Sequence, residues 1–358
     1  MLMRLQLPVY FGTRGNPNSA IAPPMGNYGT INNKGVEIAL NTINMNGAFK
    51  WSTDFQISFN KNKLVALQGT DASALEGYGQ WNDVISRSVI GGPLYDFYGY
   101  IADGVYTSRE DIESHLWGTD FENGFDRTRT VFVGDIKYRD LNGDGKIDTD
   151  DRTSIGSPLP KFVYGLNNTF SYKGFDLTVF INGSYGNKIF NNLKRQLTGM
   201  GYWTNQLKIA TEFAQLIPID ANKEYPFVDA YGRDIKNWFD DIDNVTIANP
   251  NTKMSRAGQS IPYNNSQTST RYIEDGSYLR IKNIVFGYTL PKNMIKKVQL
   301  ENVRLNVNIQ NLYTFTKYSG YDPEVGINPQ DANNFTFGFD SGRYPAPRLI
   351  SFGVNLTF

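Results

Sequence analysis

The clearest chemical pattern in this chain is an acidic stretch, residues 140–151. Oxygen-bearing side chains alternate around a glycine, as in the calcium loop D-x-[DN]-x-[DN]-G-x5-E, with aspartate in place of the final glutamate. Calcium takes about six to eight oxygen ligands, the glycine permits the sharp turn, and position 7 offers its backbone carbonyl. The sequence therefore predicts a Ca²⁺ site with six candidate residues: Asp140, Asn142, Asp144, Lys146 through its carbonyl, Asp148 and Asp151.

The flanks of this loop limit what such a site would do. Calcium sensors hold the loop between two helices. Here VFVGDIKY precedes it, and Pro158 and Pro160 follow it, so the flanks are not helical. That argues against a calcium sensor. An Asx-rich surface turn is the alternative, because Asp, Asn and Gly are common in turns without any ion.

The elements around the loop have the pattern of β-strands with one apolar and one polar face. Residues 162–172 and 175–185 alternate in this way, and Lys173-Gly174 reverses the chain between them. Residues 49–60 form the cleanest strand, after a turn at Asn46-Gly47, and 303–310 and 350–358 follow the same pattern. Strands of about ten residues with aromatic ends are typical of transmembrane β-barrels. A soluble sandwich gives a similar alternation.

The two architectures differ in what the apolar faces meet. Our hypothesis is that one face meets lipid, whereas in a sandwich it would be buried against a second sheet. Its expected members are Phe49, Trp51, Phe55, Leu177, Val179, Val303, Leu305, Phe352 and Val354. The apolar phase slips near Asn283, which predicts a β-bulge there.

Several longer motifs resemble a single family. Residues 134–187, with FYGYIADGVY, YIEDGSYLRIKNIVFGYTLP, NLYTFTKYSGYDPEV and the end RYPAPRLISFGVNLTF, resemble the SusC/RagA family of TonB-dependent outer-membrane transporters from Bacteroidetes. The resemblance covers nearly the whole chain but only the carboxy-terminal part of such a protein. It implies an all-β fold: a partial antiparallel transmembrane β-barrel, about eight strands of a 22-stranded barrel, with large extracellular loops in the cell outer membrane.

The resemblance also implies a function and partners. Family members import large nutrients, oligosaccharides or peptides, with a SusD-like surface lipoprotein, and a TonB complex acts through an amino-terminal part that is missing here. The barrel would contact outer-membrane lipid. Aromatic side chains in a long insert at residues 188–276 could stack on a glycan or peptide cargo, or they could be core residues of the folded loops. These substrate-binding candidates are Tyr202, Trp203, Tyr231 and Trp238.

Composition excludes several other classes of protein. With 35 basic and 35 acidic side chains, the net charge is zero, which argues against a nucleic-acid partner. There is no cysteine, one histidine (His115) and no G-x-S-x-G motif, so we expect no enzyme and no catalytic residue. No apolar run approaches the roughly 18 residues of a membrane helix. The alternative function from another class is a calcium-stabilised soluble β-rich adhesion or glycan-binding module.

We divide the chain into five parts. Barrel strands with one loop occupy 1–60, an extracellular insert with the calcium-type loop 61–160, a barrel hairpin 161–187, a second extracellular insert 188–276, and carboxy-terminal barrel strands 277–358. The first insert is expected to be a small subdomain containing a helix from Ser108 as N-cap through Leu116.

The connections alternate in length, which predicts their sides. Tight connections at Asn46-Gly47, Lys173-Gly174 and 291–299 alternate with long ones at 9–34, 61–160, 188–276 and 316–346. Bacterial barrels have short periplasmic turns and long outer loops, so the inserts should all face outward. Eight strands leave three alternatives: a fragment of a longer gene product, a narrow closed barrel, or a remnant that never inserts.

Overall fold

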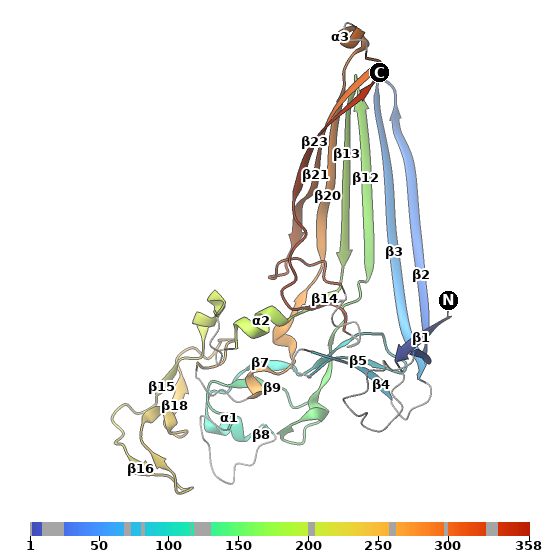
Figure 1. The fold of residues 1–358 in the computed structure, drawn as a ribbon. Coiled ribbons are helices and arrows are strands. Elements are labelled where there is room, and N and C mark those ends of the chain that lie inside the picture. Colours follow the sequence, from blue (N-terminus) through green and yellow to red (C-terminus); the bar gives the residue numbers. More distant parts are fainter. Residues whose placement is uncertain are drawn as a thin grey trace, which may run out of the picture.

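The computed structural model describes residues 2–8, 25–67, 73–79, 83–114, 116–117, 130–199, 205–257, 263–296, 300–326 and 336–358. Long strands form one tall sheet, and short elements form a lobe at one end of it (Figure 1). His115, Tyr202 and Trp203 lie outside the described residues.

The tall sheet has eight strands whose spatial order is their order in the chain, and every neighbouring pair is antiparallel. The predicted strand count and topology are therefore confirmed. The sheet is open, because β1 and β23 are its two edges, so the described residues do not form a narrow closed barrel. The strands are β1 Leu2–Pro8, β2 Met25–Asn46, β3 Phe49–Leu67, β12 Phe162–Tyr172, β13 Phe175–Tyr185, β20 Tyr278–Thr289, β21 Asn302–Thr316 and β23 Leu349–Thr357.

The register of this sheet separates an apolar face from a polar face. Directly paired residues point to the same side. One row across six strands contains Trp51, Phe170, Leu177, Phe286, Val307 and Phe352, and the adjacent row contains Phe49, Tyr172, Phe175, Tyr288, Leu305 and Val354. The opposite side carries pairs such as Asp54 with Asn167 and Thr169 with Thr178. Phe180 breaks the alternation, and it lies on the polar face against Gly165.

The nine residues predicted to share one face do so, and they lie outside the three buried clusters of the described residues, although Val303 is buried at 7% exposed. Phe352 is 80% exposed and Val354 61% exposed, so no second described sheet buries them. A sandwich would have buried such side chains. The structure therefore disfavours the soluble alternative.

Aromatic side chains mark both limits of the apolar face. Near the tight turns, Phe49, Tyr172, Phe175 and Tyr288 form one row; near the lobe, Phe59 packs on Phe162 at 5.6 Å between ring centres, and Phe162 on Tyr185 at 5.1 Å. Phe49 and Phe59 are ten residues apart on one strand, which is about 33 Å at roughly 3.3 Å per residue. At a strand tilt of about 40° this spans about 25 Å, the height of the apolar band of outer-membrane barrels.

Two strands are longer than predicted. β2 begins at Met25, within the expected loop 9–34, and β3 continues to Leu67, within the expected insert 61–160. The two strands stay paired from Gly29 opposite Leu67 to Asn33 opposite Asn62. Backbone hydrogen bonds hold this part of the pair, and they do not require apolar side chains to alternate with polar ones. The extension is also anchored, since Ile31 and Leu64 are buried against Leu94 of the lobe.

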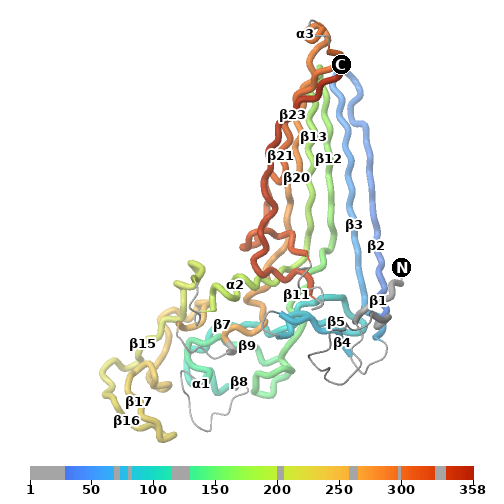
Figure 2. Tube along the Cα trace, in the orientation of Figure 1, coloured from blue at the N-terminus to red at the C-terminus, as the bar shows by residue number. Residues whose placement is uncertain are grey.

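The predicted turn at Lys173-Gly174 and the bulge are confirmed, whereas β2 and β3 are joined at residues 47–48, one position after the predicted turn and without a positive φ. Lys173 and Gly174 have φ of 46° and 86°, as a two-residue hairpin turn requires, and the register shifts beside Asn283. The third tight connection contains α3 Lys292–Ile295. All three lie at one end of the sheet, the turn end, beside the carboxyl end of the chain, and the lobe lies at the other (Figure 2).

The lobe is built from three of the long inserts. Residues 61–160 contribute β4 Ala74–Tyr78, β5 Val84–Val89, β6 Phe97–Gly99, β7 Ala102–Val105, α1 Arg109–Glu113, β8 Leu116–Trp117, β9 Ile136–Tyr138, β10 Lys146–Ile147, η1 Thr149–Asp151 and β11 Thr153–Gly156. Residues 188–276 contribute β14 Lys188–Asn191, α2 Asn192–Leu197, η2 Lys208–Glu212, β15 Leu216–Pro218, β16 Phe227–Val228, β17 Asp234–Ile235, η3 Trp238–Asp240, β18 Val245–Ile247, η4 Tyr263–Ser266, η5 Thr270–Tyr272 and β19 Ile273–Asp275. The third insert, residues 316–346, contributes β22 Phe339–Asp340.

The first insert is not a subdomain of its own, contrary to the prediction. Its main core, which includes Phe132 and Tyr138, is completed by Ala214, Val245 and Ile247 of the second insert. A second cluster joins Phe97 to Phe190 and to Phe339 of the third insert. The inserts therefore bury their apolar side chains jointly.

The predicted helix begins where expected but is shorter. Ser108 is the N-cap of α1, and its hydroxyl accepts from the Asp111 N–H. The helix ends at Glu113 with Ser114 as C-cap, whereas Leu116 belongs to β8. In the described part of the chain, no helix is both long and apolar enough to cross a membrane.

Candidate functional site

The predicted calcium loop is an ordered turn between two anchors in the lobe core. Tyr138 precedes it and Ile147 lies within it, and both are buried. Asp140 accepts from the N–H groups of Gly143 and Gly145, at 2.6 and 2.8 Å. Gly143 and Gly145 have φ of 77° and 80°, which favours glycine at both positions. The sharp turn that the motif predicted is present.

The other candidate oxygens of the loop also turn toward its backbone. The Asn142 amide oxygen accepts from the Asp144 N–H, and an Asp144 oxygen accepts from the Lys146 N–H at 2.8 Å. Asp148 caps η1 by accepting from Asp150. Asn142, Asp144, Lys146 and Asp148 are exposed, so the mouth of the loop is open to solvent.

Asp151 closes the loop. Its carboxylate is buried and accepts from Leu141 at 2.8 Å and from Asp148 at 2.9 Å, so it joins the first and last turns. In the described conformation, no group of three or more His, Cys, Asp or Glu side chains among the described residues is arranged to hold a metal ion. An Asx-rich turn and a calcium loop share these backbone hydrogen bonds, so calcium binding stays a prediction.

A buried ion pair fixes the strand that leads into the loop. Asp135 and Arg256 are 0% and 2% exposed at the side chain, with Nε 2.8 Å from Oδ1. Asn265 donates to the same carboxylate at 2.8 Å and accepts from the Ile136 N–H. Phe132 N–H donates to the other oxygen, so this buried charge is fully hydrogen-bonded. The sequence carries no local signal for this cluster, because Asp135 lies more than 120 residues from both Arg256 and Asn265.

The two described aromatic candidates have different surroundings. Trp238 packs against the lobe core and edge-on to Phe239. Tyr231 is 40% exposed and lies near two guanidinium groups: Arg109 donates to its hydroxyl, and Arg233 lies 6.0 Å from its ring. Trp238 therefore fits the core alternative, and Tyr231 is available at the surface.

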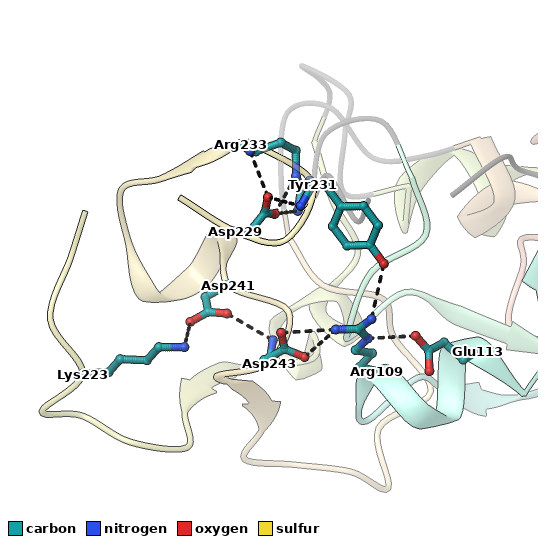
Figure 3. A network of polar contacts seen from close by, with 8 residues as sticks. All are labelled: Arg109, Glu113, Lys223, Asp229, Tyr231, Arg233, Asp241 and Asp243. Atoms are coloured by element: carbon teal, nitrogen blue, oxygen red, sulfur yellow. Dashed lines mark hydrogen bonds and ion pairs between the residues drawn. The ribbon is translucent and has the colours of Figure 1, made fainter. Parts of the chain in front are cut away.

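Charged side chains surround Tyr231 in a continuous network (Figure 3). Arg109 pairs with Glu113 at 2.8 Å and with Asp243 at 2.9 Å, and those hydrogen bonds raise the pKa of Arg109. Asp243 N–H donates to Asp241, which pairs with Lys223 at 2.5 Å. Burial opposes the charge of Lys223, but the hydrogen bond to Asp241 raises its pKa overall. The network leaves a polar surface with both signs of charge beside an exposed ring.

The third insert is held to the sheet by a second set of ion pairs. Arg280 of β20 is buried and pairs with Asp322 and, at 2.7 Å, with Glu324, both in the GYDPEV stretch. Glu274 pairs with Lys194 at 2.9 Å and accepts from Ser319. Burial alone would raise the pKa of Glu274, but these hydrogen bonds lower it. Except for Lys194, these residues lie in stretches that carried the family resemblance, although no role was predicted for them.

Comparisons with known proteins agree with this architecture. No family model matches the chain. The chain is 34% identical over 351 residues to TonB-dependent receptor P3 of Formosa agariphila, covering 95% of this chain and 30% of that receptor. It is 24% identical to TonB-dependent receptor SusC of Bacteroides thetaiotaomicron, covering 93% and 27%. In fold it is similar to the RagAB peptide transporter, with a TM-score of 0.64 at 20% identity, covering 99% of this chain and 32% of that chain.

The similarity extends over nearly all of this chain but only part of each relative. The chain spans only about 30% of the length of the curated receptors that it matches. The strand order, the apolar face and the lobe at one end of the sheet all agree with the predicted partial barrel. Along nearly its whole length, this chain is therefore a relative of TonB-dependent receptors, SusC among them, and it shares its fold with part of the RagAB transporter.

Proposed function

We propose that this chain forms part of the wall and the outer loops of an outer-membrane transporter that imports large nutrients. The observation that carries the proposal is the one-sided sheet, whose apolar face is bounded by aromatic rows about 25 Å apart. Such a face is stable in hydrocarbon and costly in water. The polar face, with Asp54, Asn167 and Asp176, would line the wet interior.

The lobe would face the cell exterior, where a SusD-like lipoprotein would cover it and cargo would enter. Its support is topological, since the long inserts all join one end of the sheet and the tight turns the other. The cargo would be an oligosaccharide or a peptide, and the related RagAB is a peptide transporter. Import would be coupled to a TonB complex, as the names of the related receptors imply.

The edges of the sheet support a wall completed by further strands. β1 and β23 do not pair with each other, and unpaired backbone groups are not tolerated in hydrocarbon. The proposal therefore requires additional strands along both edges, as the relatives' greater length would supply.

Two neighbouring substitutions test the proposal. Leu40 is 55% exposed on the apolar face opposite Phe55, near the middle of the span, whereas Asn41 lies on the polar face opposite Asp54. Leu40→Arg should cost about 2–4 kcal/mol in a membrane wall and lower the amount recovered in outer-membrane fractions several-fold. Asn41→Arg is the matched control and should leave recovery unchanged. Equal recovery of both variants, or a soluble wild-type chain, would overturn the proposal.

A further inference from the structure

A pocket of about 530 Å³ lies where β2 and β3 leave the apolar face on the lobe side. It is lined by three lysines, by apolar side chains and by several polar residues, and its lining contains no carboxylate. The residues used here are Lys34, Lys61, Lys161, Val36, Phe59 and Leu159, which together define the lysine pocket.

The register fixes the height of this pocket relative to the apolar face. Val36 pairs with Phe59, which belongs to the aromatic row near the lobe, and Lys34 pairs with Lys61 two residues further along. Residues two apart in a strand share a face. The two lysines therefore continue the apolar face about 6–7 Å beyond its aromatic limit, at a strand rise of about 3.3 Å per residue. In an outer membrane this is the level of the lipid headgroups.

The charges in the pocket lack a described counter-ion. Lys34 and Lys61 are directly opposite each other, and like charges in that position repel. None of the three pocket lysines forms an ion pair with a residue in the described part of the chain. Elsewhere in the lobe, cations such as Arg256, Lys194 and Lys223 have carboxylate partners. An anion from outside the chain would remove the repulsion.

We propose that the lysine pocket binds the phosphate headgroup of an outer-membrane lipid. The phosphate contacts Lys34 and Lys61, with Lys161 at the rim, and an acyl chain lies along Val36 and Phe59. A lipid fits better than a free anion because the same pocket offers both cations and apolar surface. This inference rests on the proposed function, since it requires the apolar face to meet lipid.

The experiment measures lipid retained by the full chain, extracted from outer membranes in mild detergent. The protein is mixed with phosphatidic acid, which carries a phosphate monoester, and with phosphatidylcholine, and retained lipids are counted by native mass spectrometry. Lys34→Gln with Lys61→Gln should lower phosphatidic acid retention at least threefold and leave phosphatidylcholine unchanged. Lys34→Arg with Lys61→Arg should retain it, and millimolar inorganic phosphate should not displace it.

The matched control removes two lysines at the turn end. Lys173 and Lys292 are also exposed, and Lys173→Gln with Lys292→Gln should not change retention. Equal loss from both double variants would show a general attraction of lysines to lipid and would overturn the site. Unchanged retention in Lys34→Gln with Lys61→Gln would also overturn it. So would displacement of the lipid by inorganic phosphate. Recovery of the wild-type protein in the outer-membrane fraction is measured first. If the protein is absent from that fraction, the proposed function fails. If it is present but retains no phosphatidic acid through the two lysines, only the lipid site fails.

Discussion

Arg256 and Asp135 form a bidentate ion pair that joins two inserts of the lobe, with Nε–Oδ1 and Nη2–Oδ2 distances of 2.8 and 3.1 Å. The two residues are 121 positions apart, and neither side chain reaches solvent appreciably. Arg256 also lies over the Phe132 ring at 5.6 Å. The pair therefore holds the second insert on the strand that leads into the loop at 140–151.

Removing Arg256 should destabilise the lobe strongly. Arg256→Met leaves Asp135 buried and without its cation, which costs about 3–5 kcal/mol. Arg139→Met is the control, because its pair with Asp103 is 50% and 43% exposed and is screened by solvent, so its loss should change stability little. Denaturant unfolding, read from lobe tryptophan fluorescence, measures both. Similar losses in the two variants would show that burial of the pair has no special role.

Calcium should stabilise the lobe through the loop at 140–151. In the wild type, calcium at about 100 times its Kd should add about 2.7 kcal/mol, and Asp140→Ala with Asp144→Ala should abolish that gain. Asp150→Ala is the matched control, since Asp150 is an exposed acid of the same loop at a position that supplies no ligand in the motif. Thermal melts with calcium and with chelator measure the difference. If the wild type melts identically in both, the loop is an Asx-rich turn.

The strands could be predicted from sequence because lipid and water impose a period of two on them. Phe49, Trp51 and Phe55 alternate with polar neighbours, and turn chemistry at Lys173-Gly174 fixed the register of the hairpin. The polar ends of β2 and β3 were missed because their pairing depends on the backbone. The lobe could not be predicted, since its core joins residues such as Tyr138 and Val245 from separate inserts, and no local period records such contacts.

Acid should loosen the third insert where Glu274 holds it. Hydrogen bonds from Lys194 and Ser319 lower the pKa of Glu274 below its ordinary value of 4.5. A depressed carboxyl pKa contributes stability that is present above about pH 4.5 and is lost as pH falls through the lower, folded-state pKa. We expect proteolysis within 316–346 to rise below that pH in the wild type. Compared with the wild type, Glu274→Gln should be cleaved faster at neutral pH, and its cleavage rate should depend less on pH between about pH 5 and 3. A variant with the same cleavage rates as the wild type at every pH would contradict the role of Glu274.

Tyr231 and Trp238 should separate cargo binding from folding. Trp238 is partly buried against the lobe core, so Trp238→Ala should cost up to about 3–5 kcal/mol of lobe stability. Tyr231 is 40% exposed, so Tyr231→Ala should cost less than about 1 kcal/mol.

If cargo stacks on this ring, Tyr231→Ala should weaken binding of a labelled oligosaccharide or peptide several-fold, whereas Tyr231→Phe keeps the ring and should preserve binding. Unfolding curves report the first effect and fluorescence anisotropy the second. Loss of binding in Tyr231→Phe would instead assign the contact to the hydroxyl that Arg109 holds, and full binding in Tyr231→Ala would remove Tyr231 from the cargo surface.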